Sequence, residues 1–340
     1  MTPNTRFNEL ITDITPSATT NSRSISAHTS IRNSLESDSK YKDNVIRTFL
    51  GGSYKRKTAI RPVSKNGKTD RPDVDIYVVV KGSDWSESPE DLINTLFSAL
   101  NRNCTELKIT KIKRNRCSIA ISTDKAEMDV SPLLERNSDG YYRIGNRNTG
   151  EWYLTDPEEH TTWSAKANSD AGMRFNPMVK MVKWSRREYP TKNKHPKSIA
   201  LEALVAKHMS STETHYGQLL HDTFDDIINS YSFLRLIGMC PELDDPAIDG
   251  GNLLSGVSGE AFSAFYDKIK YFRDEAAKAL ATDDQDVATK HWRQILGSRF
   301  PSPKTEKSSN AVGLQSAVTM SSLTFPAKAS TPPNKPADFA

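Results

Sequence analysis

The sequence predicts an α+β protein in two lobes. Short segments in which apolar and polar residues alternate occur in the first half of the chain, whereas from about residue 160 apolar residues recur with helical spacing. With 340 residues, 36% of them apolar, the chain is long enough for two domains or one large bilobed domain. We expect residues 1–165 to form the first lobe, including a long N-terminal helix, residues 166–300 a helical lobe, and residues 301–340 a tail.

Three helices are predicted in the first lobe. Apolar residues at positions 7, 10 and 11 indicate a short helix, and the Ser-, Thr- and Asn-rich segment from about 16 to 35 indicates a long one. Ser88 and Pro89, followed by two acidic residues, are typical of a helix start, and apolar residues continue at helical spacing as far as Leu100.

Three strand-like segments follow, at about 107–112, 117–121 and 126–130. In the third segment, apolar residues at 126, 128 and 130 alternate with acidic ones, which places Asp129 on the polar face of its strand. An apolar stripe from Phe175 to Val182 then opens the second lobe, and further helices are predicted at 198–209, 212–237, 259–281 and 286–297. The segment 301–340 is rich in Pro, Ser, Thr, Ala and Lys without periodicity, which predicts disorder.

The most informative stretch of the chain runs from residue 50 to residue 80. A turn formed by Gly51, Gly52 and Ser53 is followed by a basic loop and by the strand-like segment DVDIYVVV at 73–80. Side chains two apart on a strand point the same way, so Asp73 and Asp75 share one face. The apolar residues at 74, 76, 78 and 80 lie on the opposite face, toward a core. A rigid strand therefore presents two carboxylates close to a glycine-serine turn.

This combination of residues suits metal-dependent nucleotidyl transfer. Mg²⁺ prefers oxygen ligands, and two ions roughly 3.5–4 Å apart can clamp the attacking and leaving oxygens. Asp129 is the best candidate for a third ligand, holding the ion that activates the attacking ribose hydroxyl. The Gly-Ser turn (residues 51–53) can place backbone N–H groups and one hydroxyl against a triphosphate. Taken alone, the Gly-Ser turn could be an ordinary turn and each acid a surface residue. The order of the turn, the paired acids and the third acid along the chain, each on the expected turn or strand, favours catalysis.

The charge pattern supports an anionic substrate. The net charge of +4 is mild, so basic residues are informative only where they cluster. One cluster lies between Ser53 and Asp73 and a second at 180–197; their members are Lys55, Arg56, Lys57, Arg61, Lys65, Lys68 and Arg71, and Lys180, Lys183, Arg186, Arg187, Lys192, Lys194 and Lys197. Such clusters beside carboxylates suit nucleotide phosphates, and the alternative is a solvated charged face.

Composition argues against several other classes of protein. The three cysteines have no paired spacing, which disfavours a zinc site or disulfide framework and suits a reducing cytosol. No apolar segment follows the N-terminus as in a signal peptide, and none approaches the roughly 20 residues of a membrane span. We therefore expect a soluble, cytoplasmic protein without zinc and without membrane association.

The order of these motifs resembles the DNA polymerase β-like nucleotidyltransferase superfamily. In the second lobe, VKMVKW at 179–184 and HPKSIALE at 195–202 resemble the branch of oligoadenylate synthetase and cyclic GMP-AMP synthase, and in particular the bacterial cGAS/DncV-like nucleotidyltransferases (CD-NTases) of CBASS anti-phage systems. Segments 48–50, 58–62, 71–75, 262–266 and 291–301 are similar to clade D of that family. The resemblance implies a polymerase β-like catalytic lobe with a mixed sheet and helices, followed by an oligoadenylate synthetase-like helical lobe.

The resemblance also implies roles for individual residues. The expected metal ligands for two Mg²⁺ ions, which Mn²⁺ can replace, are Asp73, Asp75 and Asp129. The expected triphosphate contacts are Gly52, Ser53, Lys183 and Ser198. Two alternatives stay open: Lys183 is a surface charge, with Lys180 as the competing ligand, and Ser198 is a helix N-cap that follows Pro196.

The activity implied is the condensation of ATP, and GTP or another NTP, into an adenine-containing cyclic di- or trinucleotide such as cyclic AMP-AMP-GMP, with release of pyrophosphate. The product would reach a downstream effector in anti-phage defence. An E1–E2-like ligase is an expected partner that conjugates Ala340, the alternative being a terminus without function. DNA activation is not expected, because no zinc-binding insertion is evident. The alternatives are a toxin-type nucleotidyltransferase that modifies a protein or tRNA, and an inactive nucleotide sensor, which the intact acidic triad disfavours.

Overall fold

The computed structural model describes residues 1–65, 68–69, 71–82, 88–191 and 195–303. The tail predicted to be disordered therefore lies outside the described residues from position 304 onward, and so does Ala340. Residues 1–303 form one compact unit. No helix among the described residues is both long and apolar enough to cross a membrane.

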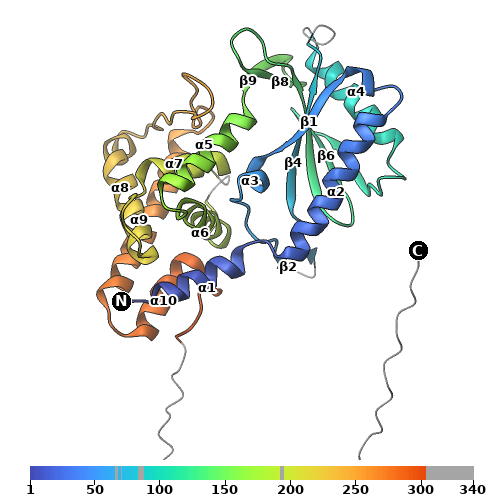
Figure 1. Ribbon diagram of the computed structural model, residues 1–340. Helices are drawn as coiled ribbons and strands as arrows, with labels where there is room; N and C mark the ends of the chain where they lie inside the picture. The colour runs from blue at the N-terminus through green and yellow to red at the C-terminus, as the bar shows by residue number, and fades with distance from the viewer. Residues whose placement is uncertain (66–67, 70, 83–87, 192–194, 304–340) are drawn as a thin grey trace, which may run out of the picture. The chain divides into compact units, whose positions relative to one another are not determined.

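The elements follow the predicted order of a mixed sheet region and a helical region (Figure 1). In the first half they are α1 (Asn4–Ile14), α2 (Ala18–Ser37), the 3-10 helix η1 (Lys42–Asn44), β1 (Val45–Gly51), α3 (Gly52–Lys55), β2 (Ser64–Lys65), β3 (Lys68–Thr69), β4 (Asp73–Val80), α4 (Pro89–Arg102), β5 (Lys111–Arg114), β6 (Ile119–Ser122), β7 (Glu127–Leu134), β8 (Tyr142–Asn146) and β9 (Glu151–Thr155). In the second half they are α5 (Pro157–Asp170), α6 (Phe175–Glu188), α7 (Ser198–His208), α8 (Tyr216–Leu236), α9 (Gly259–Ala281) and α10 (Gln285–Leu296).

The main sheet has the strand order β1-β4-β7-β6-β5, and β8 joins it through β7 and carries β9. β4 and β7 are parallel, which requires a crossover between them, and α4 lies in that connection. Val74, Ile76 and Val78 are fully buried on one face of β4, as the alternation predicts. Helices α2 and α4 cover that face with apolar residues such as Ile31 and Leu96 (Figure 1). The polar face of β4 and β7 is thereby left for the acidic residues.

A second hydrophobic core lies in the helical region. It gathers buried residues from α6 to α10, with Trp184 and Trp292 fully buried. Helix α1 also packs here, although residues 1–165 were expected to form the first lobe. The Phe7 ring meets the Trp292 ring edge-on at 5.0 Å, and the Phe300 ring at 5.2 Å. The apolar stripe of α1 thus ties the start of the chain to its last described helix.

The sheet contains β1, which was not predicted as a strand, and it differs from the prediction in two further places. β5 begins only at Lys111, because the chain turns through Lys108, whose φ of 53° lies in the left-handed region. The hairpin of β8 and β9 was not predicted, although a turn ending at Gly150, with φ of 74°, links its strands. Its second strand alternates weakly between intermediate and exposed residues, so the periodicity that marks a half-buried strand is faint.

Candidate active site

The candidate site is built on a row of residues across three neighbouring strands. Gly51 of β1 is in register with Asp75 of β4, and Asp75 is in register with Asp129 of β7. Asp73 lies two residues before Asp75 on the same face, opposite Glu127. The structure therefore brings together the three acids that the sequence proposed as metal ligands, on the face of the sheet opposite the buried valines.

The Gly-Ser turn lies directly against these acids. Gly52 has a φ of +63°, which L-residues with a side chain adopt at a cost of about 1–2 kcal/mol. A Cβ at this position would lie 1.6 Å from Oδ2 of Asp75, and a Cβ at Gly51 would lie 2.4 Å from Cε2 of Tyr77. Only glycine allows the backbone to approach the carboxylate this closely, so the two predicted motifs form one site.

The residues after Gly52 form a tightly bonded bend. The four-residue helix α3 is followed by a loop in which the N–H groups of Thr58 and Ala59 both donate to the Ser53 carbonyl, each at 3.0 Å. The Arg56 N–H donates to the Gly52 carbonyl at 3.1 Å. These bonds hold Ser53 at the wall of a cleft that also contains Asp73.

The carboxylates repel one another, and nearby cations offset this repulsion only in part. Asp73 as a whole residue is exposed to solvent, but its carboxyl group is largely desolvated. This desolvation, together with repulsion from neighbouring acids, Asp75 first among them, raises the pKa of Asp73 to about 7. Desolvation followed by repulsion from Asp129 also raises the pKa of Asp75, against the attraction of nearby cations. A cation bound between these groups would relieve both effects.

Two residues that the sequence analysis missed hold Asp129. The Asn115 amide donates to Oδ1 of Asp129 at 3.2 Å, and the Ser118 hydroxyl donates to the same oxygen at 3.1 Å. Both come from the turn between β5 and β6, whose polar composition was the available signal. They orient the carboxylate and occupy only one of its two oxygens.

The donor set fits Mg²⁺ as a partly open site. Within the described part of the chain, no group of three or more His, Cys, Asp or Glu side chains is arranged to hold a metal ion by itself. Mg²⁺ does not need one, because it keeps several waters and takes substrate phosphates as ligands beside one or two carboxylates. Carboxylates on a shared face are the oxygen ligands this cation prefers.

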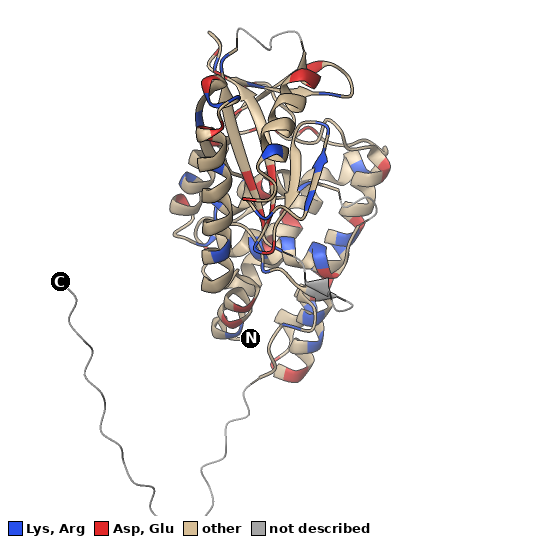
Figure 2. Ribbon diagram, turned by 90° about the vertical axis from the view of Figure 1, so that its right-hand side faces the viewer, with Lys and Arg blue, Asp and Glu red and all other residues tan. Residues whose placement is uncertain are grey.

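A cleft of about 590 Å³, a size typical of ligand sites, extends from Asp73 to the helical region. Ser53, Tyr54 and Asp73 line one side, and Lys183 and Ser198 line the other. Figure 2 shows the acidic segments of the sheet near basic segments of the adjacent loop and helices. The aromatic residue Tyr54 lines the cleft, whereas Trp152 and Trp163 pack against the two cores.

Lys183 is buried, so its interpretation as a surface charge was wrong. Its side chain is 4% exposed, and its Nζ lies 2.6 Å from Oε1 of Glu202. Lys180, the competing candidate, instead donates to the Thr15 hydroxyl at 3.1 Å. Lys183 is therefore the lysine of this pair that lines the cleft.

Ser198 is not the N-cap of its helix. The cap position of α7 is Lys197, and Ser198 is the first helical residue. Its hydroxyl oxygen accepts a hydrogen bond from Arg186 at 3.0 Å, and Arg186 also donates to the Pro196 carbonyl. The second lobe thus presents a hydroxyl and a guanidinium side by side at the cleft.

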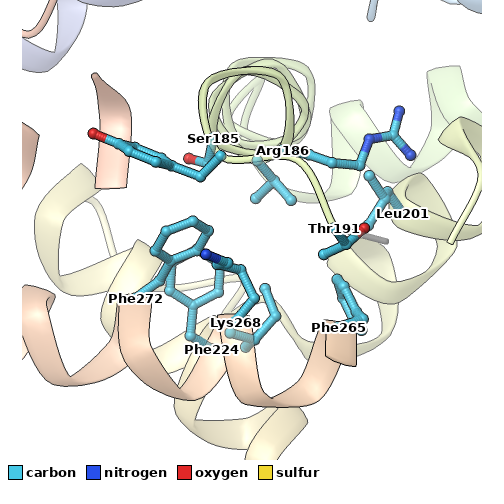
Figure 3. Close-up of a pocket in the computed structure, with 11 residues that line it drawn as sticks. Ser185, Arg186, Thr191, Leu201, Phe224, Phe265, Lys268 and Phe272 are labelled. Atoms are coloured by element: carbon cyan, nitrogen blue, oxygen red, sulfur yellow. The ribbon is translucent and has the colours of Figure 1, made fainter. Parts of the chain in front are cut away.

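A second cavity lies behind α6, inside the helical core (Figure 3). Its volume of about 10 Å³ gives room for one water at most. Phe224, Phe265 and Phe272 line it, and Arg186 extends its guanidinium away from it (Figure 3). This cavity is too small for a nucleotide and is lined by none of the acids on the sheet.

Comparison with known proteins agrees with this geometry. Residues 1–168 match the family described as the Second Messenger Oligonucleotide or Dinucleotide Synthetase domain. The chain is 38% identical to a cyclic AMP-AMP-AMP synthase of Acinetobacter sp. over 100% of its own length and 98% of that protein. It is 24% identical to a cyclic AMP-AMP-GMP synthase of Enterobacter hormaechei, over 88% and 92% of the two chains.

Solved structures show the same fold. CdnG of Bradyrhizobium diazoefficiens, in complex with GTP, superposes with a TM-score of 0.71 at 14% identity, over 87% of this chain and 95% of that one. CdnC of E. coli MS115-1 with ATP gives 0.67 at 19% identity, over 88% and 98%. The fold is that of a nucleotidyltransferase. The chain belongs to the CD-NTases, the bacterial synthases of cyclic oligonucleotide second messengers, as its sequence motifs indicated.

Proposed function

We propose that this CD-NTase joins three ATP molecules into cyclic AMP-AMP-AMP and releases pyrophosphate at each step. The observation that carries the proposal is the 38% identity to a cyclic AMP-AMP-AMP synthase along the whole chain. The two relatives named as AMP-AMP-GMP synthases are 25% and 24% identical. An all-adenine product therefore replaces the mixed adenine-guanine trimer as the favoured expectation.

The chain's own residues divide the work between the two sides of the cleft. On one side, the Ser53 hydroxyl donates a hydrogen bond to the donor triphosphate. Gly52, which has no Cβ, lets the backbone of the turn lie against the Asp75 carboxylate. On the other, Lys183 and Ser198 contact the same triphosphate. Their joint presence on the cleft walls supports this assignment. Tyr54, also on the wall, offers a ring on which an adenine can stack.

The three acids Asp73, Asp75 and Asp129 would hold Mg²⁺. When bound, the cation neutralises charge on the transferring phosphate and lowers the pKa of the attacking ribose hydroxyl. The protein's contribution is to hold the carboxylates in place on paired strands, with Asp129 oriented by Asn115 and Ser118.

Mass spectrometry of the reaction products tests the proposal. The purified protein is incubated with Mg²⁺ and either ATP alone, GTP alone or all four NTPs. We expect a cyclic adenine trimer from ATP alone and no change in product when the other nucleotides are added. A product that forms only when GTP is present would refute the all-adenine assignment. Label transferred to a protein or tRNA, without free cyclic product, would instead support the toxin-type alternative.

A matched pair of variants tests the role of the acids. Asp75→Asn removes the charge in the middle of the row, whereas Asp124→Asn removes an exposed charge from the bend before β7. We expect the first variant to lose product formation and the second to keep it. Equal activity in the two variants would contradict the metal assignment.

A further inference from the structure

A buried charge cluster links the Gly-Ser turn to the helical region. The proposed function assigns a role to Lys183 of this cluster but none to Glu202 or Arg56. At its centre is Glu202 of α7, whose side chain is 0% exposed. Arg56 donates to it through two nitrogens, at 2.9 Å and 3.0 Å. The Thr58 hydroxyl donates to Oε1 at 2.9 Å, and Lys183 donates to the same oxygen at 2.6 Å.

The three donors come from two segments that are far apart in sequence. Arg56 and Thr58 lie in the loop that follows α3, and Lys183 is on α6. Two of them are also bonded to the Gly-Ser turn through their backbone, because the N–H of Arg56 donates to the Gly52 carbonyl and that of Thr58 to the Ser53 carbonyl. Any displacement of the Glu202 carboxylate therefore acts on both the turn and Lys183.

The charges of this cluster do not balance. Arg56 and Lys183 are buried cations with side-chain exposures of 7% and 4%, and Glu202 is the anion between them. A buried charge costs several kcal/mol unless it is paired and hydrogen-bonded, so two cations that share one anion are stabilised by a second anion nearby. Both cations also act on Asp75, whose pKa they lower against the effects of burial and Asp129. Asp75 is therefore the second anion near the two cations, and through them the Glu202 cluster is coupled to the acids of the candidate site.

We propose that Glu202 is a positioning residue for nucleotidyl transfer, which holds the Gly-Ser turn and the Lys183 ammonium in the arrangement that receives the donor triphosphate. The inference rests on the proposed role of Ser53 and Lys183 at that triphosphate. It predicts that breaking the cluster impairs the use of ATP even where the fold is intact.

The test separates positioning from stability. Glu202→Gln alone leaves two buried cations without their anion and is expected to lower the melting temperature strongly. The double variant Arg56→Met with Glu202→Gln removes one charge of each sign, keeps the net charge of the cluster, and restores the melting temperature toward that of the wild type. Initial rates of product formation are then measured over a range of ATP concentrations at fixed Mg²⁺.

If Glu202 positions the turn, the double variant regains stability but has a raised KM for ATP and a kcat/KM at least about 10-fold lower, equivalent to about 1.4 kcal/mol. If the double variant recovers both its melting temperature and its kcat/KM to within about twofold, the cluster is merely structural and the inference is wrong.

Two further variants keep the test decisive if the double variant folds poorly. Thr58→Val keeps the charge and nearly the shape of the side chain but removes a donor to Glu202 and an acceptor for Lys183. We expect a several-fold loss of kcat/KM with a smaller fall in melting temperature than in Glu202→Gln. An unchanged kcat/KM in Thr58→Val would overturn the inference. The control pair Arg235→Met with Asp267→Asn removes an exposed ion pair between α8 and α9 and should alter neither quantity. Failure of the proposed function would look different, because the wild-type protein itself would then form no cyclic product.

Discussion

Replacement of Gly52 by alanine is the sharpest test of how the turn and the acids fit together. An alanine Cβ at this position would lie 1.6 Å from Oδ2, 2.4 Å from Cγ and 3.0 Å from Cβ of Asp75. The Asp75 side chain must therefore rotate away, which costs the fold little but removes the carboxylate from its place between the turn and Asp129. The positive φ of 63° adds about 1–2 kcal/mol of backbone strain.

The expected loss of activity follows from the displacement rather than from the strain. A misplacement of about 1 Å in a catalytic group can cost about 100-fold in rate, and the Cβ contact demands more than that. We expect Gly52→Ala to lower the initial rate of pyrophosphate release from ATP at least about 100-fold. The strain should lower the melting temperature by only a few degrees, on the scale of about 2–4 °C per kcal/mol for a domain of 150–250 residues.

Gly140→Ala is the matched control. Gly140 also has a positive φ, of 82°, but its Cβ would meet nothing within 4 Å. It should therefore show a similar fall in melting temperature with activity close to that of the wild type. If Gly52→Ala retained more than about a third of the wild-type rate, or if both variants lost activity equally, the close approach of turn and carboxylate would not be what glycine provides.

Three further outcomes are expected. Asp75→Asn should raise the melting temperature or leave it unchanged while abolishing product formation, because it relieves desolvation and repulsion from Asp129; a marked fall in the melting temperature would contradict this account. Phe7→Ala should lower the free energy of unfolding by about 3–5 kcal/mol in a denaturant titration, since its ring is fully buried against Trp292; a loss below about 1 kcal/mol would show that α1 is not part of the helical core. Burial opposes ionisation of Glu202, but its two cations lower its pKa to about 2, below the ordinary 4.5. Its contribution to stability is therefore full above about pH 4.5 and is lost as the pH falls toward 2. A wild-type protein whose free energy of unfolding stays constant across that window would refute this account.

Much of the site was predictable because its residues lie on elements with strong local patterns. Strict alternation along β4 determines which face each side chain takes, and the same holds for the start of β7. Glycines before a strand that carries acids indicated a close backbone approach. The pairing of β4 with β7 was inferred only from motif order, yet the register sets Asp75 directly opposite Asp129.

The residues that were missed are held by contacts between distant segments. Glu202 lies in a helix with apolar residues on nearly every side, and no periodicity distinguishes it from a surface acid. Its partner Arg56 is 146 residues away in sequence, and their pairing depends on how the two regions pack. For the same reason, the attachment of α1 to the last helix could not be read from either segment alone.

The sequence by itself determined the strands that carry the acids and the face on which each acid lies, because these depend on backbone geometry over a few residues. The tertiary structure decided that Lys183 is buried rather than exposed, that Ser198 faces Arg186 instead of capping its helix, and that one glutamate joins the turn to the helical region. Burial and ion pairing are properties of surfaces brought together by folding, and residues far apart in the chain acquire them only when the cores have formed.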